Sequence, residues 1–466
     1  MLSSVVKKIS AFRMGLRTFT KAKRSQLTPF GAKRCSSSAA TDMNVYTEKT
    51  PITAELWKKR KEFDENQQTN RTRANANANE PVLVSKEPHL SRVDARYEFS
   101  DFSCLKSIYT DSFGNVLMGK VLEDLDALAG NVAFFHSDDG IPETSPLSLV
   151  TASVENIKIL RKSISVNRDL ILSGQVVFVG RSSMDVLVEA HQVDRSDAAS
   201  GEGLSDAPVL IGPEGDKTRV LSSVFTYVAR NRGTGKSAQV NPLDTTNMSK
   251  YELEFCNARE SAMKLRKHMR ISPKAQPPKD CIVHMVDEGK SMVDMPGLFY
   301  NSNVLMKDTT QENSFICQPQ KTNTAGNIFG GFLIHSAFTL AEASVYMFSG
   351  RQANLSFVDE IIFAQPVHIG DLIRLRSRVV YVSKELPRRM VCDITVHVVK
   401  PEQVKSFLSN KFTYVFTCAS EDSHLHHDQV IIPSTAEEAN SLYTRATDVL
   451  KIDEETIRSD YNILTR

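Results

Sequence analysis

The chain has 466 residues, which is long for one domain and predicts two domains with extensions. Hydrophobic residues make up 41% and charged residues 24%, the proportions of an ordinary globular protein. A net charge of only +2 gives no whole-chain argument for binding nucleic acid, and no uncharged apolar stretch reaches about 18 residues, so no membrane span is expected. The seven cysteines form no CxxC pair, which predicts reduced thiols in an intracellular compartment.

The first forty residues differ from the rest of the chain. They hold nine Lys or Arg, and no acid precedes Asp42. Apolar residues recur between the basic ones with the spacing of an amphipathic helix. Such a basic, serine-rich segment predicts a mitochondrial transit peptide over 1–40, cleaved near Arg34, with the mature protein in the matrix. A basic disordered arm is the alternative. The polar composition of 41–91 indicates an N-terminal extension and linker.

The remaining chain nearly repeats itself. GNVLMG at 114–119 matches GNIFGG at 326–331, an offset of 212 residues, and FTYV at 225–228 returns at 412–415, an offset of 187. Each glycine-containing copy leads into an apolar, helix-like run, and strand-like stretches follow in the same order. The sequence therefore predicts two copies of one unit, each a helix followed by several strands.

Each predicted helix is apolar on nearly all sides, so most of its surface must be covered. A strongly curved antiparallel sheet wrapped around a central helix does this within about 120 residues, which is the hotdog fold. The expected class is α+β, with two hotdog domains in tandem that pair edge to edge as a pseudo-dimer. We expect hotdog domain 1 at 92–240, an inter-domain helix and linker at 241–308, hotdog domain 2 at 309–424, and a C-terminal extension at 425–466.

Two glycines, Gly330 and Gly331, stand at the start of the second apolar helix. The first N–H groups of a helix lack intrahelical partners, and the helix dipole favours negative charge at this end. Glycine lets a ligand oxygen approach these donors closely. We therefore expect this helix N-terminus to bind an oxygen of the ligand.

The two copies differ at two polar positions. Asp126, in the second turn of the first helix, corresponds to Phe338, and Asn323, in the loop before the second helix, corresponds to Asp111. A buried carboxylate is costly unless it is hydrogen-bonded, so Asp126 is a candidate for chemistry. The structural alternative is an aspartate bonded to backbone across the seam between the copies.

Neighbouring polar residues need separate interpretations. Asp124 has Lys120 four residues before it, which predicts a solvated ion pair. Glu123 lies one turn from the candidate aspartate and competes with it as the base. Asn115 and Asn327 recur in both copies, which favours a role in shaping the loop.

Other motifs are weaker. RNRGTGKS at 230–237 ends like a phosphate-binding loop, but Arg230 stands where the first glycine belongs and no helix pattern follows. HLHHD at 424–428 has no partner His or Cys at ligand spacing, so no metal site is expected. GxSxG does not occur, and a nucleophile elbow is therefore not supported.

Several motifs resemble those of acyl-coenzyme A thioesterases of the double-hotdog type, especially mitochondrial members. They are FGNVLMGKVLEDLDALAG (113–130), LVTASVENI (149–157), VGRSSM (179–184) and FICQPQKTNTAGNIFGGFL (315–333). The resemblance implies hydrolysis of acyl-CoA to free acid and CoA, with no metal or cofactor. Relatives form trimers of two-repeat chains, which implies a homotrimer.

The resemblance also implies one composite site with an Asp from one copy and an Asn from the other. Asp126 matches the first and Asn323 the second. Asp126 would act as general base toward water or attack the thioester directly. Backbone N–H groups at Gly330 and Gly331 would stabilise the oxyanion. The CoA phosphates would meet basic loop residues, for which the candidates are Arg181, Arg230 and Arg232.

Two other functional classes stay open. A hotdog hydratase or dehydratase usually needs a His or a second acid in the site. His335 is the one obvious candidate, although a core histidine is its structural interpretation. A non-catalytic acyl-CoA-binding protein is the third possibility, which thiol release from acyl-CoA would separate from the enzymes.

Overall fold

The computed structural model of the protein describes residue 52 and residues 83–100, 103–138, 147–161, 164–193, 210–211, 218–231, 234–269, 277–299, 303–323, 326–385, 387–418 and 429–461. The predicted transit peptide and the HLHHD segment lie outside these residues. No helix within them is long and apolar enough to cross a membrane. In the same part of the chain, no group of three or more His, Cys, Asp or Glu is placed to hold a metal ion.

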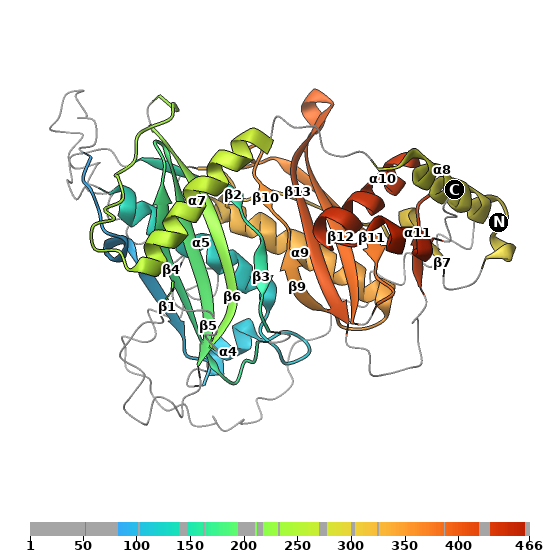
Figure 1. Ribbon diagram of the computed structural model, residues 1–466, viewed down its shortest axis with the longest axis horizontal. Helices are drawn as coiled ribbons and strands as arrows, with labels where there is room; N and C mark the ends of the chain where they lie inside the picture. The colour runs from blue at the N-terminus through green and yellow to red at the C-terminus, as the bar shows by residue number, and fades with distance from the viewer. Residues whose placement is uncertain are drawn as a thin grey trace, which may run out of the picture. The chain divides into compact units, whose positions relative to one another are not determined.

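The described chain is a mixed α+β structure built on one 12-stranded antiparallel sheet (Figure 1). The first half contributes β1 (Val93–Tyr97), α4 (Ser103–Tyr109), α5 (Met118–Ser137), β2 (Ser148–Val154), β3 (Ile157–Ile159), β4 (Asp169–Val179), β5 (Ser183–Val193), β6 (Arg219–Arg230) and α7 (Lys250–Met269). The second half contributes β8 (Gln311–Ile316), α9 (Gly330–Ser349), β9 (Asn354–Val358), β10 (Ile361–Ile362), β11 (Leu372–Val382), β12 (Arg388–Lys400), β13 (Lys405–Cys418) and α10 (Ala436–Thr444).

Shorter elements and two further helices complete the described chain. A two-stranded parallel sheet joins β7 (Asn303–Leu305) to β14 (Val430–Ile432), next to α8 (Lys279–Asp294) and α11 (Glu454–Asp460). The 3-10 turns are η1 (Pro88–Ser91), η2 (Pro296–Leu298), η3 (Met306–Thr309), η4 (Pro319–Lys321) and η5 (Pro401–Gln403), and η6 (Arg445–Val449) is a π-helical turn.

The two halves of the large sheet have the same strand order when each is followed from its outer edge to the middle of the sheet. It runs β1-β4-β5-β6-β3 and then β9-β13-β12-β11-β8, so that each strand of one half has a counterpart in the other. The halves meet where β3 pairs with β9 and β2 pairs with β10, with Ile157 opposite Val358 and Val154 opposite Ile361. This edge-to-edge pairing satisfies backbone groups that an isolated half would leave exposed.

The long helices α5 and α9 pack against the sheet and against each other. Gly174 on β4 lets α5 come close, because a Cβ there would lie 3.0 Å from Val132 and 3.5 Å from Leu128. At the helix–helix contact, a Cβ on Gly331 would lie 2.8 Å from the carbonyl oxygen of Glu123. The glycines at the helix starts therefore permit a backbone approach that a larger residue would prevent.

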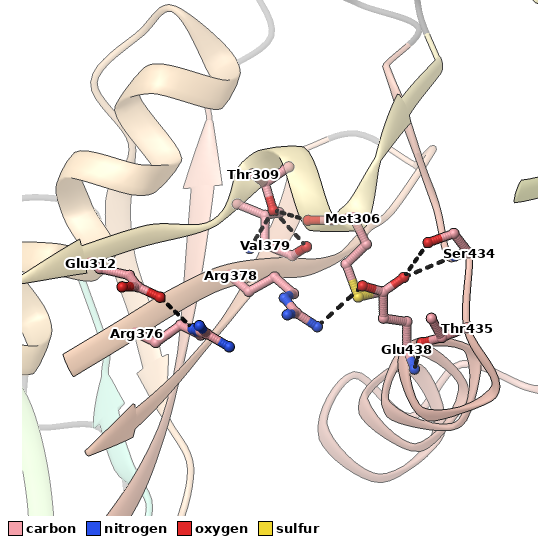
Figure 2. A network of polar contacts seen from close by, with 9 residues as sticks. All are labelled: Met306, Thr309, Glu312, Arg376, Arg378, Val379, Ser434, Thr435 and Glu438. Atoms are coloured by element: carbon pink, nitrogen blue, oxygen red, sulfur yellow. Dashed lines mark hydrogen bonds and ion pairs between the residues drawn. The ribbon is translucent and has the colours of Figure 1, made fainter. Parts of the chain in front are cut away.

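Each half ends in an outer helix that begins in the same way. Before α7, Glu252 N donates to Ser249 Oγ (3.3 Å) and Ser249 N donates to Glu252 Oε2 (2.8 Å). Before α10, Glu438 N donates to Thr435 Oγ1 (3.2 Å) and Ser434 N donates to Glu438 Oε2 (2.8 Å) (Figure 2). The Ser249–Glu252 pair is a capping box, and α10 has a close variant in which Glu438 accepts from Ser434, the residue before the cap Thr435. The two glutamates are 186 residues apart.

The two capping glutamates also fasten these helices to the sheet. Gln175 of β4 donates to Glu252 (3.0 Å), and Arg378 of β11 lies 3.3 Å from Glu438 (Figure 2). The repeat therefore extends one helix beyond its last strand. This part of the repeat is not visible in the sequence, because an outer helix exposes most of its surface and the two copies share little beyond the cap and one arginine.

Candidate active site

Asp126 lies in α5 and is fully buried. Three donors from three other elements surround its carboxylate. Gly331 N of α9 lies 2.6 Å from Oδ2, Thr151 Oγ1 of β2 lies 3.0 Å from Oδ1, and the Tyr227 hydroxyl of β6 lies 3.0 Å from Oδ1. Thr151 and Tyr227 reach the same oxygen because they stand opposite each other where β2 pairs with β6.

The contact between Asp126 and Gly331 joins the two halves of the chain. Because α9 begins at Gly330, the N–H of Gly331 is one of the donors that the helix itself leaves without a partner. The carboxylate occupies the end of the helix where negative charge is favoured. An aspartate bonded to backbone across the seam was the structural alternative in the sequence analysis, and this bond is present.

The environment of Asp126 shifts its acidity. Burial raises the pKa of Asp126 from 3.8 to about 6, although hydrogen bonds from Tyr227, Thr151 and Gly331 lower it, and the charge of Glu123 raises it further. A carboxyl group with a pKa near 6 is ionised at neutral pH and still takes up a proton readily. Three hydrogen bonds also leave room on the two oxygens for about one more donor, such as a water.

The two predicted glycines sit directly on this carboxylate. A Cβ on Gly330 would lie 2.9 Å from Asp126 Oδ2 and 3.1 Å from the Phe363 ring. A Cβ on Gly331 would lie 2.6 Å from the Phe329 ring. Glycine is therefore required at both positions for the carboxylate and the helix end to meet.

Asn323 lies in the loop before α9, and its side chain closes that loop. Its Oδ1 accepts from Asn327 N (3.1 Å), as Asp111 Oδ1 accepts from Asn115 N (2.8 Å) in the other copy. No hydrogen bond joins Asn323 to Asp126 among the contacts of the described residues. Asn115 and Asn327 take part through their backbone N–H groups, so a loop-shaping role of their side chains stays a prediction.

The candidate arginines lie at one end of the sheet. Arg230 ends β6 and stands opposite Ser148 of β2, three residues along the strand from Tyr227, a separation of about 10 Å. Arg181 lies in the turn before β5, where Ser182 O accepts from Ala229 N (2.9 Å). Both side chains are exposed, and Arg232 lies outside the described residues.

The prediction of a solvated ion pair for Asp124 is wrong. Asp124 is fully buried, and its Oδ2 accepts hydrogen bonds from the hydroxyls of Tyr97 (2.8 Å) and Tyr109 (2.5 Å). Lys120 lies instead 5.6 Å from the centre of the Tyr109 ring. β1 and the end of α4 cover this side of α5, which the spacing within one helix could not reveal.

The start of α5, at Gly119, corresponds to the start of α9 that binds Asp126, and side chains fill the space beside it. A Cβ on Gly119 would lie 2.5 Å from His335 Cδ2 and 3.2 Å from the Phe338 ring. His335 is not a core histidine, because a quarter of its side chain is exposed and its Nδ1 lies 2.9 Å from Glu123 Oε2. The start of α5 is therefore blocked by an imidazole and a phenyl ring.

Sequence reasoning missed Thr151 and Tyr227. Tyr227 stands in the FTYV motif, and its repetition in the second copy gave no sign of a special role. The counterpart Tyr414 donates to the carbonyl oxygen of Ile334 (2.8 Å). The Tyr227 hydroxyl likewise lies 2.9 Å from a helix carbonyl oxygen, that of Asp126, and of the two tyrosines only Tyr227 also contacts a carboxylate.

Comparison with curated proteins identifies relatives over most of the chain. It is 36% identical over 370 residues to acyl-coenzyme A thioesterase 2, chloroplastic, of Humulus lupulus, a match that covers 78% of this chain and 81% of that protein. It is 35% identical over 410 residues to acyl-coenzyme A thioesterase 4, mitochondrial, of the same plant, covering 85% and 72%. Identity to acyl-coenzyme A thioesterase 9, mitochondrial, of Mus musculus is 30% over 287 residues, covering 59% and 60%.

Other comparisons are more distant. No family model matches the chain. Among solved structures, an acyl-CoA hydrolase from Staphylococcus aureus in complex with butyryl coenzyme A is 19% identical, with a TM-score of 0.30, and covers 34% of this chain and 96% of that one.

Proposed function

Since this chain belongs to the acyl-coenzyme A thioesterase family, we propose that it hydrolyses fatty acyl-CoA to free fatty acid and CoA. The main structural support for this proposal is the buried Asp126 carboxylate, which accepts a hydrogen bond from Gly331 N of the other half at 2.6 Å. Buried acids with a raised pKa are typical of general bases.

In the proposed reaction, Asp126 takes a proton from a water molecule whose oxygen attacks the thioester carbonyl carbon. A carbon–oxygen bond forms, the carbon–sulfur bond breaks, and the CoA thiolate takes the proton back from Asp126. Direct attack by Asp126, through an anhydride that water then hydrolyses, is the variant of this mechanism.

The other predicted site residues keep their proposed roles with one change. Because Gly331 N–H donates to Asp126, it serves to hold the base, and the neighbouring Gly330 N–H is our first candidate for stabilising the oxyanion, a contribution of about 3 kcal/mol per donor. Asn323 would orient the water or the carbonyl. Arg181, Arg230 and Arg232 would meet the CoA phosphates.

We further propose that each half is a hotdog domain and that the two pair as a pseudo-dimer with one working site. The mirrored strand order and the seam between β3 and β9 support this arrangement. We propose 92–240 and 309–424 for the central helix and sheet of each domain. The shared outer helices, α7 and α10, lie beyond these limits and are proposed as one more element of each repeat.

Location and assembly are also proposals. The basic first forty residues and the relatives named mitochondrial favour the mitochondrial matrix, while one relative is named chloroplastic. N-terminal sequencing of the protein from mitochondria would test this, and a start near Met1 would contradict it. A homotrimer is proposed from the family resemblance, and a monomer mass by light scattering at micromolar concentration would rule it out.

The functional test is release of CoA thiol from a panel of acyl-CoAs of increasing chain length, with Asp126→Asn as the matched variant. The contact of His335 with Glu123 is the one observation that favours a hydratase instead. Addition of water to an enoyl-CoA without thiol release would support that alternative. Binding of acyl-CoA with neither reaction would leave a non-catalytic binding protein.

A further inference from the structure

Glu123 and His335 occupy the same position in the two copies of the repeat. They are 212 residues apart, the offset of the two glycine motifs, and each lies four residues after the matching glycine. Their side chains meet, with His335 Nδ1 2.9 Å from Glu123 Oε2. Because the carboxylate is an acceptor, the imidazole nitrogen is the donor. The same position thus supplies an acid from α5 and a base from α9, and these bind each other between the two halves.

We propose that His335 is a positioning residue, an inference that rests on the proposed hydrolysis. By donating a hydrogen bond to Glu123, it holds this carboxylate in place and partly compensates its negative charge, which lies one turn from Asp126. Glu123 and Asp126 are three residues apart on α5 and therefore share a face. The backbone carbonyl of Glu123 also packs against Gly331, whose N–H holds the Asp126 carboxylate.

The charges around the pair are consistent with this role. Burial raises the pKa of Glu123, but the hydrogen bond and charge of His335, with Lys321 and Lys120, lower it below its usual value. Glu123 is thus ionised at neutral pH, and its charge raises the pKa of Asp126. The charged and titratable groups that face the three residues are Lys120 of α5, Lys321 of η4, Tyr109 of α4, Glu342 of α9 and Tyr227 of β6.

Packing is the competing explanation, because the His335 ring also fills the space beside Gly119. The two explanations differ in what they do to the pH dependence of activity. Loss of packing lowers activity or stability at every pH. Loss of the donated hydrogen bond leaves the charge of Glu123 less compensated, so a higher pH is needed to ionise Asp126.

The experiment measures kcat/KM against pH for acyl-CoA hydrolysis by the full chain. His335→Leu should move the acidic limb of the profile upward by about one pH unit, and Glu123→Gln should move it downward. The double variant should resemble Glu123→Gln, because His335 acts only through Glu123. His335→Asn, whose amide can donate in place of Nδ1, should stay near the wild-type limb. If His335→Leu fails to fold, His335→Ala, which also removes the donor, takes its place.

The outcomes separate this proposal from the proposed function. Thiol release with an acidic limb that none of these variants moves would leave the hydrolase standing and overturn the role of His335. If the wild type releases no thiol, the titration of Asp126 is read by infrared absorption of its carboxyl group, as the difference between each variant and its Asp126→Asn counterpart. The same opposite shifts are then expected, and their absence overturns the proposal.

Discussion

Arg259 and Arg445 occupy the same place in the two halves and make the same two contacts. They are 186 residues apart, and each stands seven residues after the capping glutamate of its outer helix. Arg259 of α7 binds Asp185 of β5 (2.7 Å from Nη2) and also Glu155, in the turn between β2 and β3. That turn leads into β3, which pairs with β9 of the other half.

Arg445 repeats the arrangement on the second half. Its Nε lies 2.9 Å from Asp393 of β12, and its Nη1 lies 3.5 Å from Asp359, in the turn between β9 and β10. Each arginine therefore ties an outer helix, a central strand and a turn at the seam. Both turns lie next to the strands that join the halves, β3 and β9. The two ion-pair networks therefore link the outer helices to the place where the halves meet.

Replacing Arg259 with Ala should lower the free energy of unfolding by about 3 kcal/mol, because it leaves two acids in a buried network without their cation. The Arg259 side chain is only 10% exposed. Arg445→Ala is the matched control and should cost less, since its side chain is 22% exposed and one of its two contacts is long. Urea unfolding followed by circular dichroism measures both. Equal, small losses would mean that the seam does not depend on these arginines.

Asp126→Asn should reduce acyl-CoA turnover about 100-fold or more, because it keeps the shape of the side chain and removes the base. At pH 8, Glu123→Gln should stay close to the wild type. Asn323→Ala should lower turnover, while Phe338→Ala should chiefly lower stability through lost packing. Thiol release by folded variants checks each of these. Normal turnover by Asp126→Asn, with loss in Glu123→Gln, would assign the base to Glu123.

Stability should depend on pH through Asp126 in a defined direction. Its pKa is about 6 in the folded protein against 3.8 as the usual value, so the folded state holds a proton that the unfolded state has lost between these values. Stability relative to Asp126→Asn should therefore fall as pH rises from 4 to 7, by up to about 3 kcal/mol. Thermal melts of both proteins across this range test the sign. A difference that rises with pH would contradict the raised pKa.

Activity should follow the opposite course. Asp126 must be ionised to act as base, so kcat/KM should increase with pH through about 6 and then level off. Tyr227→Phe removes a hydrogen bond that lowers the pKa of Asp126, and the acidic limb should move upward. Tyr414→Phe is its control, because that hydroxyl donates to the Ile334 carbonyl and should leave the limb in place.

Alanine at the start of α9 should disrupt the site in two distinguishable ways. Gly330→Ala would place a methyl group 2.9 Å from Asp126 Oδ2, and Gly331→Ala would place one 2.8 Å from the carbonyl oxygen of Glu123. The second should also lower the melting temperature, because backbone cannot move aside as a side chain can. Gly297→Ala meets nothing within 4 Å and serves as control. Wild-type activity in Gly330→Ala would remove that residue from the site.

The sequence alone determined the features that depend on local pattern. The offset of 212 residues between glycine motifs predicted a repeated helix-and-strand unit, and the all-apolar helices predicted their burial. Comparison of the copies singled out Asp126, because a carboxylate replaced by Phe338 is visible without any structure. These inferences work because periodicity and composition report which face of an element is covered.

The tertiary structure decided which groups meet. Asp126 and Asp124 lie on the same helix, yet one is held by Gly331 from 205 residues away and the other by Tyr97 and Tyr109. No pattern within α5 distinguishes these partners, because they come from segments that the fold alone brings together. A buried carboxylate takes its pKa and its role from such partners, so the sequence could name the candidate, and only the packed halves could supply the donors around it.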